Sequence, residues 1–446
     1  MKRQSKKTKL ETLVSLAKRR GLIFQSSEIY GGVGSIYDYG PIGVELKRNI
    51  REMWWRAMVS DRDDVVGIET AIIMHPEVWV SSGHVAGFSD PLSECLNCHH
   101  RYRDDQIEGR ECPECGGELT EPRQFNLMFN TFMGPVQEDA ARVYLRPETA
   151  QGIFVNFENV LNTTRRKLPF GIAQIGKSFR NEITPGNYIF RMREFEQMEM
   201  EYFCKPAEAE DTFRQWVNLS MEWFTHFGIR SKNLRLREHS VEERPHYAVA
   251  ATDIEYRFPW GWGELETINN RSDYDLRNHM KGSGRDLTYF DDDSKDRYVP
   301  YVIEPAFGVD RSLLAYLADA YDEEEIGGKT RTVLRFHPKI APNTIAVLPL
   351  SRNETLIPTA RRIFQQIKTQ FAVQYDDSQS IGRRYRRQDE IGTPLCVTVD
   401  FDTVNTDQSV TIRNRDTMAQ IRVPITALNA ALSDELAALT DSLSDE

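Results

Sequence analysis

Long apolar runs are missing from this chain of 446 residues. No run approaches the roughly eighteen residues that a membrane-spanning helix needs, so we expect no membrane partner. No apolar signal core follows the basic start at residues 1–7, which makes a cytoplasmic protein the default expectation. Internal repeats and low-complexity tracts are missing as well. With 40% hydrophobic and 28% charged residues, the composition indicates a folded protein long enough for two or three domains.

Cysteine is scarce, and six residues in a chain of this length do not suggest a secreted disulfide scaffold. Four of them form two Cys-x-x-Cys pairs: Cys95, Cys98, Cys112 and Cys115. Each pair presents two thiolates on one side of a turn, and two pairs can enclose a structural Zn²⁺ in a tetrahedral all-sulfur site. The alternatives are stray thiols or a redox pair, but the spacing favours zinc. Cys204 and Cys396 stand alone, and we interpret both as buried, inert thiols.

The chain as a whole carries no excess of positive charge. The net charge of −11 argues against binding nucleic acid by bulk attraction, although it allows a local basic face such as the cluster at residues 383–387. Neither a Walker loop nor a Rossmann fingerprint is present. The segment 281–285 (Lys-Gly-Ser-Gly-Arg) lacks the required spacing, and we interpret it as a hairpin turn.

The periodicity of apolar residues divides the chain into two parts. Residues 152–311 are mostly alternating strands with one clear helix around residues 207–227, which predicts a large antiparallel sheet with helices around it. From residue 341, apolar strands alternate with helices, as in a small α/β domain with a parallel sheet. We therefore predict a first domain at 1–330, with a zinc-ribbon insertion at 93–120, and a second domain at 341–446. Residues 44–58 form an amphipathic helix with two tryptophans, which suits a subunit interface or the protein's own core equally.

The segment from residue 180 to residue 202 contains the strongest candidates for ligand-binding side chains. Arg180 and Glu182 alternate along a strand end and face one side, as do Arg191 and Arg193 after a loop. Arginine forks bind phosphate oxygens in pairs, whereas carboxylates bind an ammonium group. The alternative is a plain surface hairpin. On the next strand the residues that point one way are Gln197, Glu199 and Glu201, with no lysine among them.

Two further segments suit a phosphate ligand. Gly308 to Arg311 opens a helix, where an arginine is a natural phosphate contact, although an ordinary N-cap by Asp310 with a surface arginine is the alternative. Glu264 lies in a Gly-Trp-Gly-Glu-Leu-Glu segment, and carboxylates near a triphosphate usually hold Mg²⁺.

Together these motifs closely resemble the glycyl-tRNA synthetases, the homodimeric kind of class II aminoacyl-tRNA synthetase, over nearly the whole chain. Residues 29–55 resemble the dimer-forming first motif, and residues 146–152 (Arg-Pro-Glu-Thr-Ala-Gln-Gly) are close to a family signature. Residues 179–195 are similar to the second class II motif and residues 308–311 to the third. Residues 375–394 resemble the C-terminal anticodon-binding domain.

The resemblance implies a fold: an α+β catalytic domain built on an antiparallel sheet, with a zinc-ribbon insertion and a C-terminal α/β anticodon-binding domain. It also implies the partners ATP with Mg²⁺, glycine, tRNA(Gly) and a second copy of the chain. Glycine would be activated to glycyl-adenylate with release of pyrophosphate, and then transferred to tRNA with release of AMP. Because size excludes every larger amino acid, no editing domain is expected.

The resemblance also implies roles for residues, with Arg180 and Arg311 as the catalytic pair. The expected ATP site comprises Arg180, Asn181, Glu182, Phe190, Arg191, Met192, Arg193, Glu194, Phe195, Glu264 (beside Mg²⁺), Leu265, Gly308, Val309, Asp310 and Arg311. The expected glycine site comprises Arg101, Glu148, Phe195, Glu196, Gln197, Met198, Glu199, Arg271, Glu304, Pro305, Ala306, Phe307 and Gly308.

Three residues depart from the family pattern. Ala306 stands where serine is usual, and Thr267 and Asn269 stand where glycine and alanine are usual. These differences concern the details of glycine binding. Ala306 leaves open an enzyme that activates another small amino acid or makes a dinucleotide. The other alternative is a non-catalytic accessory factor on the same fold, which would be expected to have lost the arginines that this chain retains.

Overall fold

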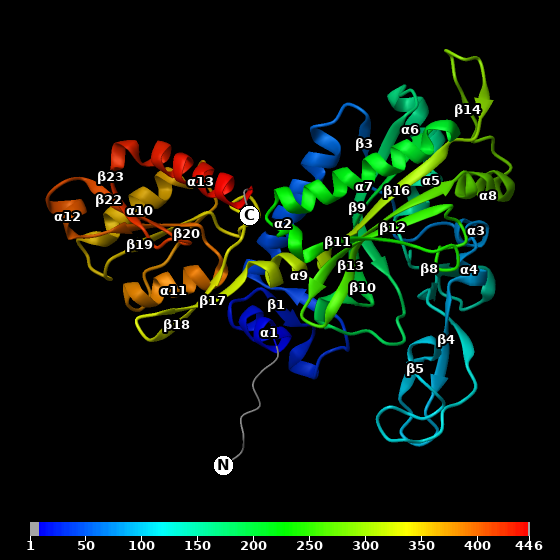
Figure 1. Ribbon diagram of the computed structural model, residues 1–446, viewed down its shortest axis with the longest axis horizontal. Helices are drawn as coiled ribbons and strands as arrows, with labels where there is room; N and C mark the ends of the chain where they lie inside the picture. Colours follow the sequence, from blue (N-terminus) through cyan, green and yellow to red (C-terminus); the bar gives the residue numbers. More distant parts are fainter. Residues whose placement is uncertain (1–8, 445–446) are drawn as a thin grey trace.

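The computed structural model describes residues 9–444, with side chains to residue 440, and shows two α/β units joined by a β-hairpin (Figure 1). Residues 1–8, which include the basic start, and residues 445–446 lie outside this part. No helix between residues 9 and 444 is long and apolar enough to cross a membrane.

The larger unit is built on a seven-stranded sheet, in the order β11-β12-β13-β16-β10-β9-β3. All neighbouring strands are antiparallel except β3, which runs parallel to β9. The prediction of a large antiparallel sheet is therefore confirmed. The strands are β3 (Val65–Gly67), β9 (Phe170–Phe179), β10 (Glu194–Cys204), β11 (Leu234–Glu238), β12 (Ala250–Phe258), β13 (Gly261–Ser272) and β16 (Tyr301–Gly308).

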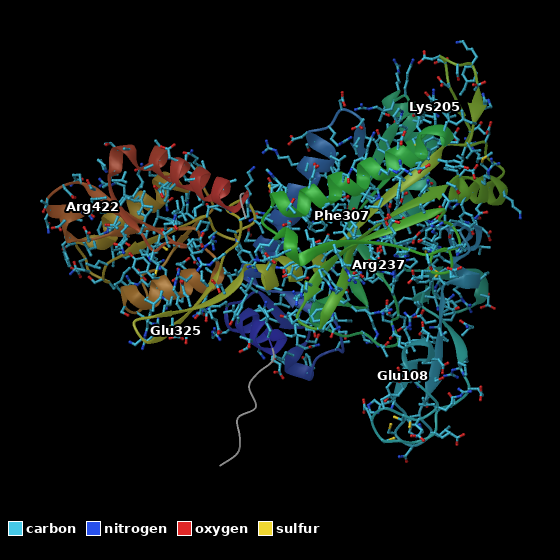
Figure 2. The ribbon with its side chains drawn as sticks, viewed as in Figure 1. Glu108, Lys205, Arg237, Phe307, Glu325 and Arg422 are labelled. Carbon is cyan, nitrogen blue, oxygen red and sulfur yellow. The ribbon has the colours of Figure 1, made fainter. Side chains whose placement is uncertain are left out.

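One face of this sheet is closed by α2 (Pro41–Trp55), α7 (Ala209–His226) and α9 (Val309–Ala320) (Figure 1). Phe307 points from β16 into this core (Figure 2), where its ring lies 5.8 Å from that of Trp54 and 5.5 Å from that of Trp223. Met198 and Met200 enter the same core from β10. Because side chains alternate along a strand, Gln197 and Glu199 point to the opposite face, which is left for a site.

The amphipathic helix predicted at residues 44–58 is α2, followed by a wider turn at residues 56–60. Its apolar stripe, with Leu46, Ile50 and Trp54, is fully buried within the chain's own core, while Trp55 is only partly buried. Of the two interpretations of this helix, a subunit interface and the protein's own core, core packing accounts for Trp54.

The prediction of a hairpin turn at residues 281–285 is wrong. Helix α8 (Tyr274–Ser283) runs into this segment and ends at Gly284, whose φ of +70° forms the C-cap and whose N–H donates to the carbonyl of Met280. A glycine just past the last helical turn is a common C-cap, and the sequence pattern alone did not separate that role from a turn between strands.

The smaller unit contains a five-stranded sheet in the order β20-β19-β21-β22-β23. The parallel strands expected from the sequence are β19 (Ile345–Pro349), β20 (Val373–Tyr375) and β21 (Leu395–Val399), with α10 (Leu356–Ile367) and α11 (Ile381–Ile391) between them. An antiparallel pair that the sequence pattern did not reveal follows, β22 (Ser409–Asn414) and β23 (Gln420–Pro424), and α13 (Leu428–Ser444) ends the described chain.

The connection between the units is the hairpin of β17 (Tyr321–Ile326) and β18 (Lys329–Leu334). Arg331 on β18 donates to Asp389 on α11 at 2.8 Å, and Arg413 on β22 donates to the same carboxylate at 2.9 Å. All three side chains are buried, so the hairpin is fixed to the smaller unit by paired charges.

Candidate active site

A cavity of about 290 Å³ opens on the face of the large sheet opposite the helical core. Its walls come from β10, β13 and β16, from the end of β9 and from the loops beside them. Many of the residues expected from the sequence line it: Glu148, Arg180, Glu182, Phe190, Arg191, Met192, Phe195, Glu196, Gln197, Glu199, Glu264, Glu304, Ala306, Phe307, Gly308, Asp310 and Arg311.

The sheet register explains how distant segments meet here. Ala306 on β16 pairs with Glu199 on β10 and with Thr267 on β13, so these side chains form one row across three strands. Glu304 pairs with Asn269 in the next row. Since residues two apart on a strand share a face, both rows point into the cavity.

One end of the cavity contains arginines. The guanidinium of Arg180 lies 5.3 Å from the ring centroids of Phe88 and Phe195, and its Nε donates to the carbonyl of Pro147 at 2.9 Å. These contacts fix the plane of the fork and leave its two terminal nitrogens for an anion.

Two further arginines flank the first, each paired with a carboxylate. Arg191 donates through Nε to Glu182 at 2.8 Å. Arg311, at the start of α9, donates to Glu264 at 2.7 Å and lies 4.6 Å from the ring centroid of Phe190. Three guanidinium groups at one end of a cavity form an anion site that suits a polyphosphate.

The other end contains carboxylates. Glu199 accepts hydrogen bonds from Thr149 and from Gln197, and burial beside Glu304 and Glu148 raises its pKa to about 8. Burial likewise raises the pKa of Glu304 to about 7. Glu148 is the exception, because His84 and Arg271 hold its pKa well below the usual range despite burial. A cluster of crowded, buried carboxylates is a site for a cation such as an ammonium group.

A buried arginine lies beneath this acidic end. Arg271 is 1% exposed and donates to Glu304 at 2.5 Å and to both oxygens of Asp275 at 2.7 and 2.9 Å. The ring centroid of Tyr247 lies 4.0 Å from its guanidinium carbon. Because those partners surround it, Arg271 supports the carboxylates without lining the cavity.

Several expected site residues lie elsewhere. Met198, Leu265 and Val309 lie in the core, and Pro305 is buried on β16. Arg193 donates to the carbonyl of Gly34 at 3.0 Å. The others are Asn181, whose N–H donates to the carbonyl of Leu127, Glu194, which pairs with Lys177, and Arg101, which pairs with Glu94 and is 62% exposed.

The sequence did not single out four residues that line the cavity: Ile189, His239, Pro245 and Tyr247. Ile189 lies in the loop before Arg191, and the other three belong to residues 239–249, which connect β11 and β12. That connection contains no motif. Only its position between two strands that border the site could have pointed to it, and strand order is not visible in the sequence.

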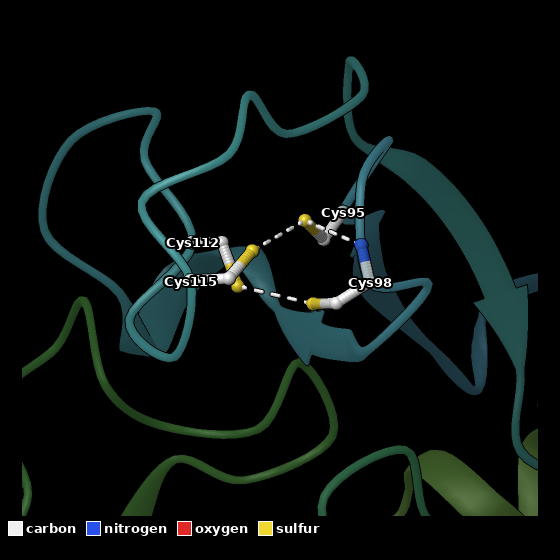
Figure 3. Close-up of side chains that lie close together, drawn as sticks. All are labelled: Cys95, Cys98, Cys112 and Cys115. Atoms are coloured by element: carbon white, nitrogen blue, oxygen red, sulfur yellow. Dashed lines mark hydrogen bonds between the residues drawn. The ribbon is translucent and has the colours of Figure 1, made fainter.

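The four cysteines form a second cluster, in the connections between the strands of a small three-stranded sheet that projects from the large unit (Figure 1). Its strands are β4 (Ser89–Glu94), β5 (Arg101–Arg103) and β6 (Arg123–Asn126). The sulfurs converge, with Cys95 and Cys115 3.5 Å apart and Cys98 and Cys112 3.6 Å apart (Figure 3). A tetrahedral zinc site with Zn–S bonds of about 2.3 Å places its sulfurs about 3.8 Å apart, so the four fit that ion. This is one of two groups of side chains in residues 9–440 that could hold a metal.

The basic cluster at residues 383–387 is divided by the fold. Arg384 is buried and donates to the carbonyls of Asp377 and Gln379 at 2.6 Å, so it stabilises the start of α11. Arg387 pairs with Asp376. Arg383 and Arg386 are exposed and face solvent.

Family models match two parts of the chain. Residues 130–320 match the tRNA synthetase class II core domain (G, H, P, S and T), and residues 344–435 match the anticodon binding domain. The first range contains most of the cavity and the second contains the smaller sheet.

Close relatives cover nearly the whole chain. A glycine–tRNA ligase of Caldanaerobacter subterraneus subsp. tengcongensis is 54% identical, with 96% of this chain and 99% of the relative aligned. That of Streptomyces coelicolor is 53% identical, with coverage of 96% and 98%. Among solved structures, prolyl-tRNA synthetase of Giardia lamblia, in complex with prolyl-adenylate, matches with a TM-score of 0.71 at 15% identity, over 98% of this chain and 81% of that chain. At that identity the likeness shows the fold alone.

Proposed function

The chain belongs to the glycine–tRNA ligases, a family of class II aminoacyl-tRNA synthetases, and on this premise we propose which of its residues carry out the reaction. The enzyme activates glycine with ATP to glycyl-adenylate, releasing pyrophosphate, and then transfers the glycyl group to tRNA(Gly), releasing AMP. The sequence-based expectations of fold class and reaction are confirmed.

One observation supports the assignment of residues, namely that a single cavity has arginines at one end and carboxylates at the other. ATP brings negative charge to such a cavity, and glycine brings an ammonium group together with a carboxylate. The reacting atoms, the α-phosphorus and a carboxylate oxygen of glycine, then meet where the two ends join. Arg180 lies at this junction, since it contacts Phe195 and lies near the loop that contains Glu148.

In the activation step, a carboxylate oxygen of glycine attacks the α-phosphorus and the bond to the leaving pyrophosphate breaks. This displacement needs alignment and neutralised charge rather than a general acid or base. We assign Arg180 to the α-phosphate and the glycine carboxylate, Arg311 to the γ-phosphate, and Phe195 to stacking on adenine. The remaining ATP-site residues, including Arg193, Asn181 and Glu194, stay predictions.

At the acidic end, Glu148, Glu199 and Glu304 would receive the ammonium group of glycine. Glu196 lies slightly apart, because it pairs with Lys47 at 3.0 Å. The role of Arg101 in glycine binding stays a prediction, since its side chain lies on the projecting sheet.

Two metals fit residues of this chain. Glu264 accepts from Arg311 through one oxygen and is 42% exposed, so its carboxylate would be available to hold a Mg²⁺ ion that arrives with ATP. When bound, Mg²⁺ would neutralise phosphate charge. For the four cysteines we propose a structural zinc ion, because a closed all-sulfur site leaves no position for a substrate.

Three further statements rest on the family alone. We propose that the chain forms a homodimer, that it works in the cytoplasm, and that the smaller domain binds the anticodon of tRNA(Gly). The domain limits of 1–330 and 341–446, with the insertion at 93–120, are part of the same proposal. The limit at residue 330 falls within β18 of the connecting hairpin at residues 321–334, and the insertion lies within the projecting sheet at residues 89–126.

The experiment that tests the proposal is glycine-dependent exchange of pyrophosphate into ATP, with alanine and serine as controls. Exchange with glycine alone is expected. Exchange with alanine or serine would show that the pocket with Ala306 accepts a larger amino acid, and folded protein with no exchange would favour the accessory-factor alternative.

A further inference from the structure

The carboxylate of Glu304 is held at both oxygens by two residues of β13. Asn269 donates from Nδ2 to Oε2 at 2.7 Å, and Arg271 donates from Nη1 to Oε1 at 2.5 Å. Asn269 is 4% exposed and Glu304 is 3% exposed, so water does not compete for these bonds. Both donors come from β13, beside the shift in its register with β16 between Asn270 and Ser272, so they reach the carboxylate from different directions.

The arginine alone is a weak counter-charge for Glu304, because Arg271 is shared. Its Nε and Nη2 donate to Asp275, which leaves only Nη1 for Glu304. Several acids interact with Glu304: Glu199 and Glu201 on β10, Glu148 before the short helix at residues 150–154, Asp275 on α8 and Tyr247 in the connection of β11 and β12. His84 pairs with Glu148 at 3.4 Å, and His239 lines the same cavity.

We propose that Asn269 is a positioning residue for glycine: its amide fixes Oε2 of Glu304, so that the carboxylate stays an acceptor and faces the ammonium group of the amino acid. The inference rests on the proposed assignment of Glu304 to the glycine site. A protonated carboxyl group would present an O–H to the ammonium group, which can only donate hydrogen bonds, and a rotated carboxylate would turn its acceptor oxygens away.

The electrostatics agree with this geometry. Burial raises the pKa of Glu304 to about 7, while the hydrogen bond from Asn269 opposes that rise because it favours the charged form. Glycine should therefore bind less well as the pH falls through about 7. Without the amide, the same loss of binding should begin at a higher pH.

The test is glycine-dependent pyrophosphate exchange by Asn269→Ala at several pH values. A hydrogen bond to a buried charged group is worth enough to raise the KM for glycine about tenfold at neutral pH, while kcat and the KM for ATP change little. The pH at which KM begins to rise should move upward. Asn269→Ser keeps a hydrogen-bond donor and should recover part of the affinity for glycine. This variant also allows the measurement if the alanine variant folds poorly. Asn269→Asp adds a like charge and should be the weakest binder.

Asn270→Ala is the matched control. Asn270 is a buried asparagine one residue away on the opposite face, where its side chain accepts from the N–H of Ser272. This change should leave the KM for glycine and its pH profile as in the unchanged enzyme. A second comparison uses Glu304→Gln, in which Asn269→Ala should add no further loss, since its effect passes through Glu304.

Different results would overturn the role of Asn269 and the proposed function. An unchanged KM and pH profile in Asn269→Ala would overturn the proposal, and so would an equal loss in the Glu304→Gln background. If the unchanged enzyme shows no glycine-dependent exchange, the proposed function fails first and the inference fails with it.

Discussion

Replacing Arg180 by alanine should remove nearly all adenylate formation. The side chain is half-buried between the rings of Phe88 and Phe195, and the carbonyl of Pro147 occupies its Nε. Only the terminal nitrogens are then available for phosphate and carboxylate oxygens. Removing one preorganised donor of this kind costs about 10²- to 10³-fold in kcat, so losing the whole charged fork should cost about 10³-fold or more.

Stability should fall much less than activity. The substitution removes two aromatic stacks and one hydrogen bond of a partly solvated side chain, and together these interactions are worth about 1–2 kcal/mol. Arg180→Lys keeps the charge but not the planar fork, so it should recover only part of the rate.

The measurement is pyrophosphate exchange at saturating glycine and ATP, together with urea unfolding of each variant. Arg214→Ala is the control, since Arg214 is an arginine on the outer surface of α7 that is 66% exposed and paired with Glu210. Near-normal exchange by Arg180→Ala would refute the assignment. A loss of stability far above 2 kcal/mol would show instead that the arginine is structural.

Three other predictions concern the zinc site, the tRNA and a buried carboxylate. One equivalent of zinc per chain is expected by metal analysis, and Cys112→Ser with Cys115→Ser should remove it; metal-free protein with unreacted thiols would contradict the zinc ribbon. Arg383→Ala with Arg386→Ala should raise the KM for tRNA while glycine-dependent exchange is unchanged, because only the second step needs the tRNA; equal losses in both steps would contradict this. Glu201→Met should increase the free energy of unfolding at pH 8 by about 1 kcal/mol, since both carboxylate oxygens of Glu201 are buried without a partner and burial raises its pKa; equal stability of the two proteins in urea at pH 8 would contradict this.

The sequence predicted those parts of the site that depend on local periodicity. Alternation along β10 sets the face of Glu199, and Arg180 follows the end of β9; the structure brings both side chains to one cavity, while their roles stay predictions. Arg193 shares that alternation in sequence, yet the structure turns it toward Gly34, because a loop between strands does not follow a two-residue period.

Contacts between distant segments could not be predicted in the same way. Tyr247 enters the site only because β11 and β12 lie at the edge of the sheet beside β13, which is a property of strand order. Arg384 looks like its neighbours in a basic run, yet its position on the buried side of α11 turns it inward, where it binds backbone carbonyls. The sequence of a basic run alone does not show which arginine faces solvent and which binds buried carbonyl groups; the fold decides this.

The buried carboxylates at the acidic end of the cavity destabilise the fold when no ligand is bound. Because the ammonium group of any amino acid relieves this effect, it contributes to affinity and not to specificity. The pKa values of Glu199 and Glu304, about 8 and about 7, exceed the value of about 4.3 in an unfolded chain. As the pH rises from about 4.5 to about 8, the unfolded chain therefore loses these protons first, and the stability of the folded enzyme falls across this window. An ammonium group supplies the missing positive charge and recovers part of that loss. Every amino acid offers the same ammonium group, so charge gives affinity without selecting glycine. Selection then has to come from the space beside Ala306 and Thr267, where any side chain on the substrate would compete with the two strands for volume.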